Sequence, residues 1–308
     1  MQEIISRIKI GILGVAVLAI FSPLSHAEVH WQELQVESVY GTQYSAYSAS
    51  TDSQTGFMTG ETTEIKTLTL DYTNAWDLGV TYFYVDLYMD GDDINVWTQG
   101  YEHFSLSKIL KTDAFTFGPV ADLNLSLGWQ LANNDPAYAG DTAQAILDSS
   151  AWPGMKPVNP KYDVIDIFTG ADFKINAPGF DAMGLTIGVY TDLNDQTDYD
   201  PQLTAIWYYR STFSIGPTDW KAEGFVQWYD KRDSNSGALN QQSWLFSNLQ
   251  FMLDTGKLLW GTPNQLYLGT EVQWSIHKFG LGDVHNGTGY ITRETNELFP
   301  ALILEWVF

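Results

Sequence analysis

The feature that most limits the fold of this chain is an alternation of apolar and polar residues that recurs along most of its length. In residues 121–131, every odd position holds Ala, Leu or Trp, and every even position holds Asp, Asn, Ser, Gly or Gln. Successive residues of a β-strand point to opposite faces, so such a segment has one apolar and one polar face. Residues 183–192, 202–213 and 265–277 follow the same pattern. Their length, about ten residues, suits a tilted strand that crosses a bilayer.

The alternation predicts about twelve strands, an even number that returns both ends of a bacterial barrel to the periplasm. Every second connection is short, as in residues 74–77, 177–182 and 216–219. We therefore predict an all-β fold, a transmembrane antiparallel up-and-down β-barrel with short periplasmic turns and longer extracellular loops. The predicted strands begin near Leu34, Glu64, Leu78, Tyr101, Val120, Tyr162, Met183, Gln202, Trp220, Trp244, Gln265 and Glu297. The predicted outer loops are residues 48–60, 91–99, 134–160, 195–200, 231–241 and 280–293.

Both ends of the chain fit an outer-membrane protein. Arg7 and Lys9 precede an apolar run over residues 10–21, which is too short to span a bilayer as a helix. We expect residues 1–27 to be a signal peptide and residues 28–308 to be the barrel domain, in the cell outer membrane of a Gram-negative bacterium. A single membrane anchor is the less favoured alternative. The last strand alternates apolar residues up to Phe308, a pattern that the outer-membrane assembly machinery could bind.

The composition excludes several classes of partner. Acidic residues outnumber basic ones 37 to 15, and the formal net charge of −22 argues against a nucleic-acid polymer and against an anion-tuned pore. The 12 Trp, 17 Tyr and 16 Phe are an unusually high aromatic content for a soluble secreted protein. Aromatic girdles at the membrane interfaces explain most of the rings near strand ends. These rings belong to Trp76, Trp97, Trp207, Tyr209, Trp220, Trp228, Trp260 and Trp274.

The polar faces of the strands provide an inventory of the expected lumen. Tyr82, Tyr84, Asp86 and Tyr88 share one face and form a ladder of rings with hydrogen-bonding tips. The ladder could stack a flat solute, or its rings could simply fill a narrow barrel, and the sequence leaves both interpretations open. The other candidate pore-lining residues are Tyr190, Tyr208, Arg210, Trp244, Phe246, Glu271 and Gln273. This lining favours a neutral, polar solute that is aromatic or sugar-like.

Charged residues share the inward faces. Three inward cations would face six carboxylates, forming either structural salt bridges or a transverse electric field. The cations are Lys174, Arg210 and Lys221, and the carboxylates are Asp122, Asp166, Asp172, Glu223, Glu271 and Glu305.

Catalysis and metal binding find little support in the sequence. A lipid-cleaving barrel enzyme needs a serine beside a histidine on the lipid side. Neither inward histidine, His103 or His277, has such a partner, so we expect no catalytic residues and no enzyme activity. No His or carboxylate spacing predicts a metal site or a cofactor. Asp90, Asp92 and Asp93 in an expected outer loop could bridge to lipopolysaccharide through divalent cations, although solvated charge is the simpler interpretation.

Several short motifs between residues 64 and 134 carry a family resemblance. Trp76 precedes Tyr82-x-Tyr84-x-Asp86, and the later motifs are Phe104-Ser105-Leu106-Ser107-Lys108, Phe117-Gly118-Pro119 and Ala132-Asn133-Asn134. In these motifs the chain resembles the nucleoside-specific channel-forming outer-membrane proteins (Tsx-type), with the related vibrio porins that serve as phage receptors. The resemblance implies a monomeric twelve-stranded barrel whose narrow aromatic pore passes nucleosides. A structural or receptor-type barrel, with residues 134–160 as plug or docking surface, and a channel for neutral oligosaccharides are the alternatives.

Overall fold

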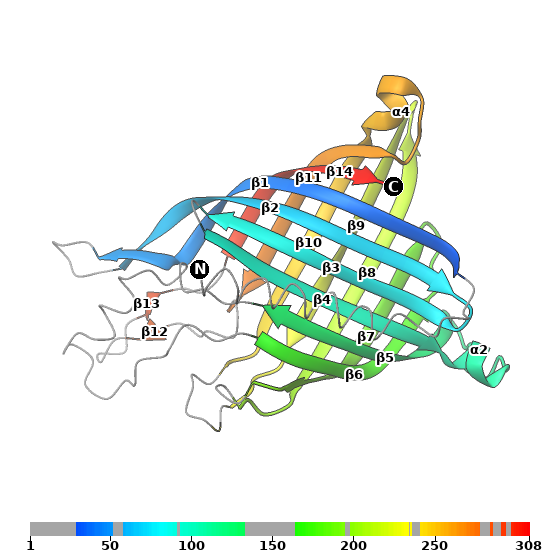
Figure 1. The fold of residues 1–308 in the computed structure, drawn as a ribbon, viewed down its shortest axis with the longest axis horizontal. Coiled ribbons are helices and arrows are strands. Elements are labelled where there is room, and N and C mark those ends of the chain that lie inside the picture. Colours follow the sequence, from blue (N-terminus) through cyan, green and yellow to red (C-terminus); the bar gives the residue numbers. More distant parts are fainter. Residues whose placement is uncertain are drawn as a thin grey trace, which may run out of the picture.

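Twelve strands pair into one closed antiparallel barrel (Figure 1). This computed structural model describes residues 29–51, 58–90, 93–132, 164–194, 198–233, 235, 241–277, 284–285, 291–293 and 297–308. Each barrel strand pairs with the next one along the chain, and the first pairs with the last, in the order β1-β14-β11-β10-β9-β8-β7-β6-β5-β4-β3-β2. The predicted twelve-stranded barrel is confirmed.

Nine strands begin within two residues of the predicted starts, whereas β1, β2 and β4 begin at Val29, Met58 and Asp93, earlier than the predicted Leu34, Glu64 and Tyr101. The barrel strands are β1 (Val29–Thr51), β2 (Met58–Trp76), β3 (Gly79–Asp90), β4 (Asp93–Ser105), β5 (Val120–Ala132), β6 (Val164–Ile175), β7 (Ala182–Asp192), β8 (Gln202–Ile215), β9 (Thr218–Tyr229), β10 (Trp244–Asp254), β11 (Leu266–Ile276) and β14 (Glu297–Val307). A separate pair, β12 (Val284–His285) with β13 (Ile291–Arg293), lies between β11 and β14 in the chain.

The C-terminal strand closes the barrel. β14 pairs with β1 in a register that sets Glu305 opposite Glu37, and the amide of Phe308 donates a hydrogen bond to the carbonyl of Leu34 at 2.9 Å. On the other side, β14 pairs with β11, so its backbone is hydrogen-bonded along both edges. A closed barrel leaves no strand edge unpaired, as a lipid environment requires.

The two faces of the wall differ as the alternation predicts. On β14, Leu302 and Leu304 are 61% and 47% exposed, whereas the alternate residues Ile303 and Glu305 are 0% exposed. A closed barrel with apolar residues outside and polar residues inside is built for lipid rather than water. Other exposed apolar residues on outward faces are Leu68, Leu70, Ile187, Leu203, Trp207, Leu249 and Leu268.

Two expectations about the connections are wrong. The predicted loop over residues 91–99 is mostly strand, because β4 begins at Asp93 and pairs from there with Asp90 of β3. The sequence does not show a clear alternation here, because the apolar residue Trp97 lies on the inward face, where a polar residue is expected. Short helices also occupy two periplasmic turns: α2 (Leu106–Leu110) and α4 (Thr255–Trp260). With five and six residues, they are too short to show a helical periodicity.

The expected signal peptide and the expected loop over residues 134–160 lie outside the described residues. Among the residues that are described, no helix combines the length and the apolar character that crossing a membrane requires.

Candidate functional site

A cluster of rings fills part of the lumen. Six buried residues on six strands, together called the aromatic cluster, point inward: Tyr101, Phe168, Tyr190, Ile206, Tyr229 and Trp244. The rings of Tyr229 and Trp244 are parallel, with centroids 3.8 Å apart, and Tyr190 stacks at 6.0 Å on the far side of Tyr229. Tyr229 ends β9 and Trp244 begins β10, so this part of the cluster lies toward the outer loops.

Inward glycines make room for these rings, a role that the alternation of apolar and polar residues does not reveal. Gly170 and Gly188 lie opposite each other on β6 and β7, with the ring of Phe168 over both. A Cβ atom on Gly188 would lie 2.4 Å from Phe168 Cζ and 2.7 Å from Gly170 Cα. Since the obstacle includes backbone, no small shift of a side chain would relieve it. The sequence signal for this arrangement is a glycine on the polar face of a strand whose inward neighbours are aromatic.

The four residues of the predicted tyrosine ladder lie on the inward face of β3. The Tyr84 hydroxyl donates to Gln99 Oε1 at 2.8 Å, and the Tyr88 hydroxyl donates to Asp86 Oδ2 at 2.9 Å. Tyr82 packs against the aromatic cluster. The ladder therefore continues the aromatic cluster along a neighbouring wall, with its hydroxyl groups hydrogen-bonded to other lumen side chains.

One residue assigned to an aromatic girdle belongs to this lumen. Trp97 of β4 lies opposite Asp86, so it shares the inward face with the ladder. The girdle assignment was wrong for Trp97 because it rested on position near a strand end, without regard to the strand's phase.

The remaining predicted residues share the inward face. Tyr190 and Trp244 belong to the aromatic cluster, and Phe246 packs against it with its ring centroid 5.6 Å from that of Phe225. The Tyr208 hydroxyl points to Asp172 Oδ2 at 3.4 Å. Gln273 Nε2 donates to Glu271 Oε1 at 2.8 Å.

A charged network occupies the periplasmic half of the lumen. Lys221 of β9, whose side chain is fully buried, contacts Glu305 Oε1 at 2.6 Å and Glu223 Oε1 at 2.5 Å. Its ammonium also lies 4.8 Å from the ring centroid of Tyr267. We call Lys221, Glu223 and Glu305 the lysine bridge. Because Glu305 belongs to β14, three strands away from β9 around the barrel, this contact is made across the lumen.

A second ion pair also spans the lumen. Arg210 Nη1 of β8 lies 2.8 Å from Glu33 Oε1 of β1, although four strands separate β8 from β1 in the barrel order. Arg210 Nε lies 3.5 Å from Glu223 Oε2, which links this pair to the lysine bridge. Glu33 was missed because it precedes Leu34, where the first strand was expected to begin.

Three inward carboxylates are bound by neutral side chains instead. Gln250 Nε2 donates to Glu37 Oε2 at 3.2 Å and to Glu271 Oε2 at 2.9 Å. Asp86 accepts from Thr69 Oγ1 at 2.6 Å as well as from Tyr88. Within the described part of the chain, no Lys or Arg forms an ion pair with Glu37, Asp86 or Glu271. We call these residues the amide-bound and hydroxyl-bound carboxylates.

Oxygens of Glu37, Glu223 and Glu305 lie within 4.8 Å of one another, a spacing that a metal ion could use. However, the Lys221 ammonium already contacts two of these three carboxylates. The chemistry of this group is therefore that of an ion pair, and it does not support a metal centre.

The extracellular mouth is crossed by Arg232, which was not among the predicted lumen residues. Arg232 follows β9, and its Nη1 lies 3.2 Å from Asp166 Oδ1 of β6. Its guanidinium stacks 4.3 Å from the ring centroid of Tyr199, and its Nε donates to Gln241 Oε1 at 2.7 Å. Because Arg232 lay in an expected loop, alternation could not assign it to the lumen.

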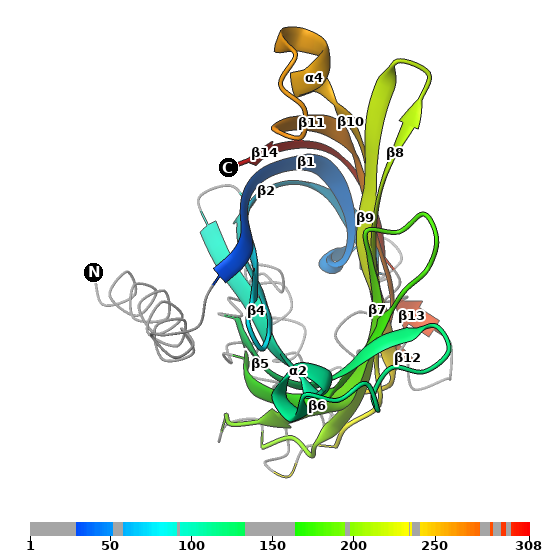
Figure 2. The same ribbon diagram turned by 90° about the vertical axis from the view of Figure 1, so that its right-hand side faces the viewer.

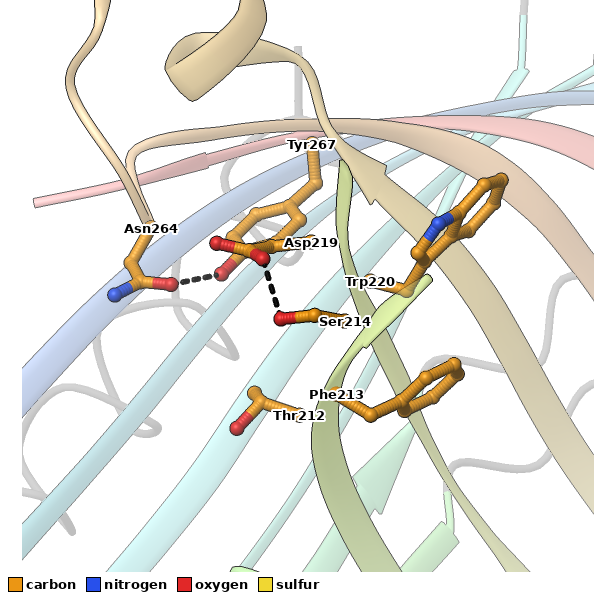
Figure 3. Close-up of a pocket in the computed structure, with 7 residues that line it drawn as sticks. All are labelled: Thr212, Phe213, Ser214, Asp219, Trp220, Asn264 and Tyr267. Atoms are coloured by element: carbon orange, nitrogen blue, oxygen red, sulfur yellow. Dashed lines mark hydrogen bonds between the residues drawn. The ribbon is translucent and has the colours of Figure 1, made fainter. Parts of the chain in front are cut away.

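A polar pocket of about 250 Å³ lies at the opposite, periplasmic end. It forms between the β8–β9 hairpin and the turn that follows α4 (Figure 3). The Ser214 hydroxyl donates to Asp219 Oδ1 at 2.7 Å, and the Tyr267 hydroxyl donates to Asn264 Oδ1 at 2.9 Å. Tyr267 also stacks under Lys221, so the pocket adjoins the lysine bridge.

The structure brings one histidine close to a serine. His103 Nδ1 lies 2.7 Å from Ser126 Oγ, and both residues face the lumen. The Ser126 side chain has no exposed surface, and among the described residues no carboxylate is hydrogen-bonded to the imidazole. The oxygens of the nearby Asp172 accept from Asn124 and Thr186 instead. The described residues therefore do not form the complete set of nucleophile, base and orienting group that nucleophilic catalysis requires.

Comparison with known proteins gives distant structural likenesses only. No family model matches the chain, and no curated protein matches it. An outer-membrane channel from Pseudomonas putida F1 aligns at 11% identity and a TM-score of 0.44, over 93% of this chain and 99% of that one. The translocator domain of the autotransporter NalP from Neisseria meningitidis aligns at 8% identity and 0.37, over 97% and 95%. A BenF-like porin from Pseudomonas fluorescens Pf-5 aligns at 10% identity and 0.25, over 92% and 99%.

Because these identities and TM-scores are low, the assignment rests on the strand pairing and the two faces of this chain's own wall. The closed barrel, its apolar exterior and its polar lumen define an outer-membrane β-barrel protein.

Proposed function

We propose that this protein is an outer-membrane channel through which small polar solutes diffuse, with nucleosides as the class that fits the lumen best. The observation that carries the proposal is the continuous inward surface formed by the aromatic cluster and the tyrosine ladder. Ring faces can stack on a flat base, while hydroxyl and carboxylate groups beside them can bind the hydroxyls of a sugar. The proposed partners are outer-membrane lipid, lipopolysaccharide, the assembly machinery and the solute, and the proposed state is a monomer.

The proposal includes no catalytic step and no cofactor. Among the described residues, the His103–Ser126 pair has a buried serine and no carboxylate hydrogen-bonded to the imidazole.

A specific observation favours a second candidate, a structural or receptor-type barrel, for example with a phage-binding or adhesion surface. Side chains cross the lumen at several levels, including the Lys221–Glu305 and Arg210–Glu33 pairs and the hydrogen bond between the Tyr101 and Tyr190 hydroxyls at 2.5 Å. Such contacts strengthen a barrel and narrow its passage. A channel for neutral oligosaccharides is a further alternative, and its larger solutes would require these contacts to open.

The tyrosine ladder gives the first test. Tyr84→Ala is expected to raise the half-saturating adenosine concentration for uptake into proteoliposomes by about tenfold, since one base–aromatic stacking contact is worth about 1–3 kcal/mol. Asp86→Ala is expected to raise it by a similar factor, because a hydrogen bond from a sugar hydroxyl to a charged group is worth about 1.5–3 kcal/mol. Tyr84→Phe separates the ring from the hydroxyl that binds Gln99. The control is Tyr40→Ala, which removes an exposed tyrosine from the lipid-facing side of β1.

Equal uptake by wild type and both ladder variants would overturn the assignment of the ladder as a binding track. Preferential uptake of a neutral trisaccharide over adenosine would favour the oligosaccharide alternative.

A further inference from the structure

The helix α4 presents three consecutive apolar side chains to the outside of the barrel. Leu258, Leu259 and Trp260 are 50%, 69% and 48% exposed, comparable to the lipid-facing Leu268 at 50%. In the view along the barrel, α4 stands outside the ring of strands, beyond β11 and β14 (Figure 2). Adjacent exposed apolar side chains mark a surface that contacts a membrane or another partner.

The surrounding contacts hold α4 in this outward position. The buried Asp254 caps the helix by accepting from the Lys257 amide at 2.8 Å, and its other oxygen accepts from the Asn264 amide at 2.7 Å. Gly261 ends the helix with a φ of 76°. Lys257 Nζ also contacts Asp219 Oδ2 at 2.5 Å, which ties α4 to the β8–β9 hairpin. The exposed leucines are thus presented by a helix anchored at both ends.

The apolar surface of α4 continues the lipid-facing surface of the barrel. The ring centroid of Trp260 lies 6.3 Å from that of Trp306 on β14, which in turn lies 6.3 Å from Phe308. Trp306 and Phe308 share the outward phase of β14 with Leu302 and Leu304. Tryptophan is enriched where a membrane meets water, so the contact places Trp260 at the edge of the apolar belt.

We propose that α4 is a lipid anchor, which inserts Leu258, Leu259 and Trp260 into the headgroup region of the inner leaflet and binds phospholipid there. Short apolar segments beside a charged pair suit this boundary, where Lys257 and Asp219 can remain hydrated. The leaflet is the inner one because α4 lies at the barrel end where the C-terminus lies (Figure 1), and Leu266, at the start of the strand that follows α4, pairs with Trp306 near the end of β14. The inference is independent of which solute the lumen passes.

The absence of cysteine from the sequence makes a direct test possible. A nitroxide spin label is attached at Leu259→Cys in the full chain, reconstituted into vesicles of phosphatidylethanolamine and phosphatidylglycerol. Power saturation then compares collisions with apolar oxygen and with a water-soluble nickel chelate. The matched labels are Leu302→Cys on the lipid-facing wall and Asp113→Cys, an exposed position in the turn after α2. Heat-dependent migration in gels verifies that each variant is folded.

The proposal predicts that the Leu259 label favours oxygen over the nickel chelate, as the Leu302 label does and the Asp113 label does not. A Leu259 label with the nickel accessibility of Asp113 would place α4 in water and overturn the proposal. A label shielded from both reagents would indicate a protein partner, such as a second copy of the chain, and would overturn it equally.

Discussion

Replacing Lys221 by methionine is expected to destabilise the barrel by about 3–5 kcal/mol, because removing one partner of a buried ion pair leaves the other charge uncompensated. The ammonium contacts Glu223 and Glu305 and has no exposed surface. A third carboxylate, Glu37, has an oxygen within 4.8 Å of theirs. Without Lys221, the three carboxylates would repel one another in a space that excludes much of the water.

The free energy of unfolding, measured by urea titration of the reconstituted protein, checks this expectation. The matched control is Lys257→Met, which removes an ion pair to Asp219 whose two side chains are 40% and 31% exposed, and little change is expected there. The double variant Lys221→Met/Glu305→Met should recover much of the lost stability, because apolar residues can replace both members of a buried pair. A Lys221→Met barrel as stable as wild type would show that the lysine bridge contributes little.

A second large effect is expected in ion selectivity: the lumen should conduct K⁺ in preference to Cl⁻ by roughly tenfold, as one-signed clefts concentrate counter-ions. Arg210 and Lys221 are occupied by Glu33, Glu223 and Glu305. The amide-bound and hydroxyl-bound carboxylates have no such cation within the described residues, so each of them that is ionised adds uncompensated negative charge to the lumen.

The reversal potential across a planar bilayer with a KCl gradient measures this preference. Glu37→Gln combined with Glu271→Gln should reduce it while leaving both lumen-crossing ion pairs intact. Asp113→Asn, at an exposed turn, controls for loss of charge outside the lumen. Anion preference in wild type, or an unchanged ratio in the double variant, would contradict the assignment of these carboxylates.

Alternation alone predicted the architecture because a barrel wall separates two solvents. Leu302 and Leu304 face lipid, whereas Glu305 faces the lumen. Because the two faces alternate along each strand, the sequence alternates between apolar and polar residues. The same logic placed the tyrosine ladder and the other seven candidate lining residues on the inward face. The aromatic girdle was less predictable, because Trp97 is apolar in character but faces inward.

Contacts across the lumen could not be predicted in the same way. The Arg210–Glu33 pair depends on barrel curvature and strand stagger, which bring β8 close to β1 across the interior. Arg232 reaches the mouth from a connection, where no periodicity operates. The α4 helix depends on the Asp254 cap, a local signal in a turn of a fold that was predicted to be all-β.

Single-channel conductance in a planar bilayer, with and without adenosine, tests the central claim most directly. The account predicts discrete conductance steps in wild type that adenosine reduces in a concentration-dependent way, and weaker block in Tyr84→Ala. No conductance from folded, inserted protein would contradict the channel and favour the structural or receptor-type barrel. Conductance that adenosine leaves unchanged would contradict the nucleoside assignment.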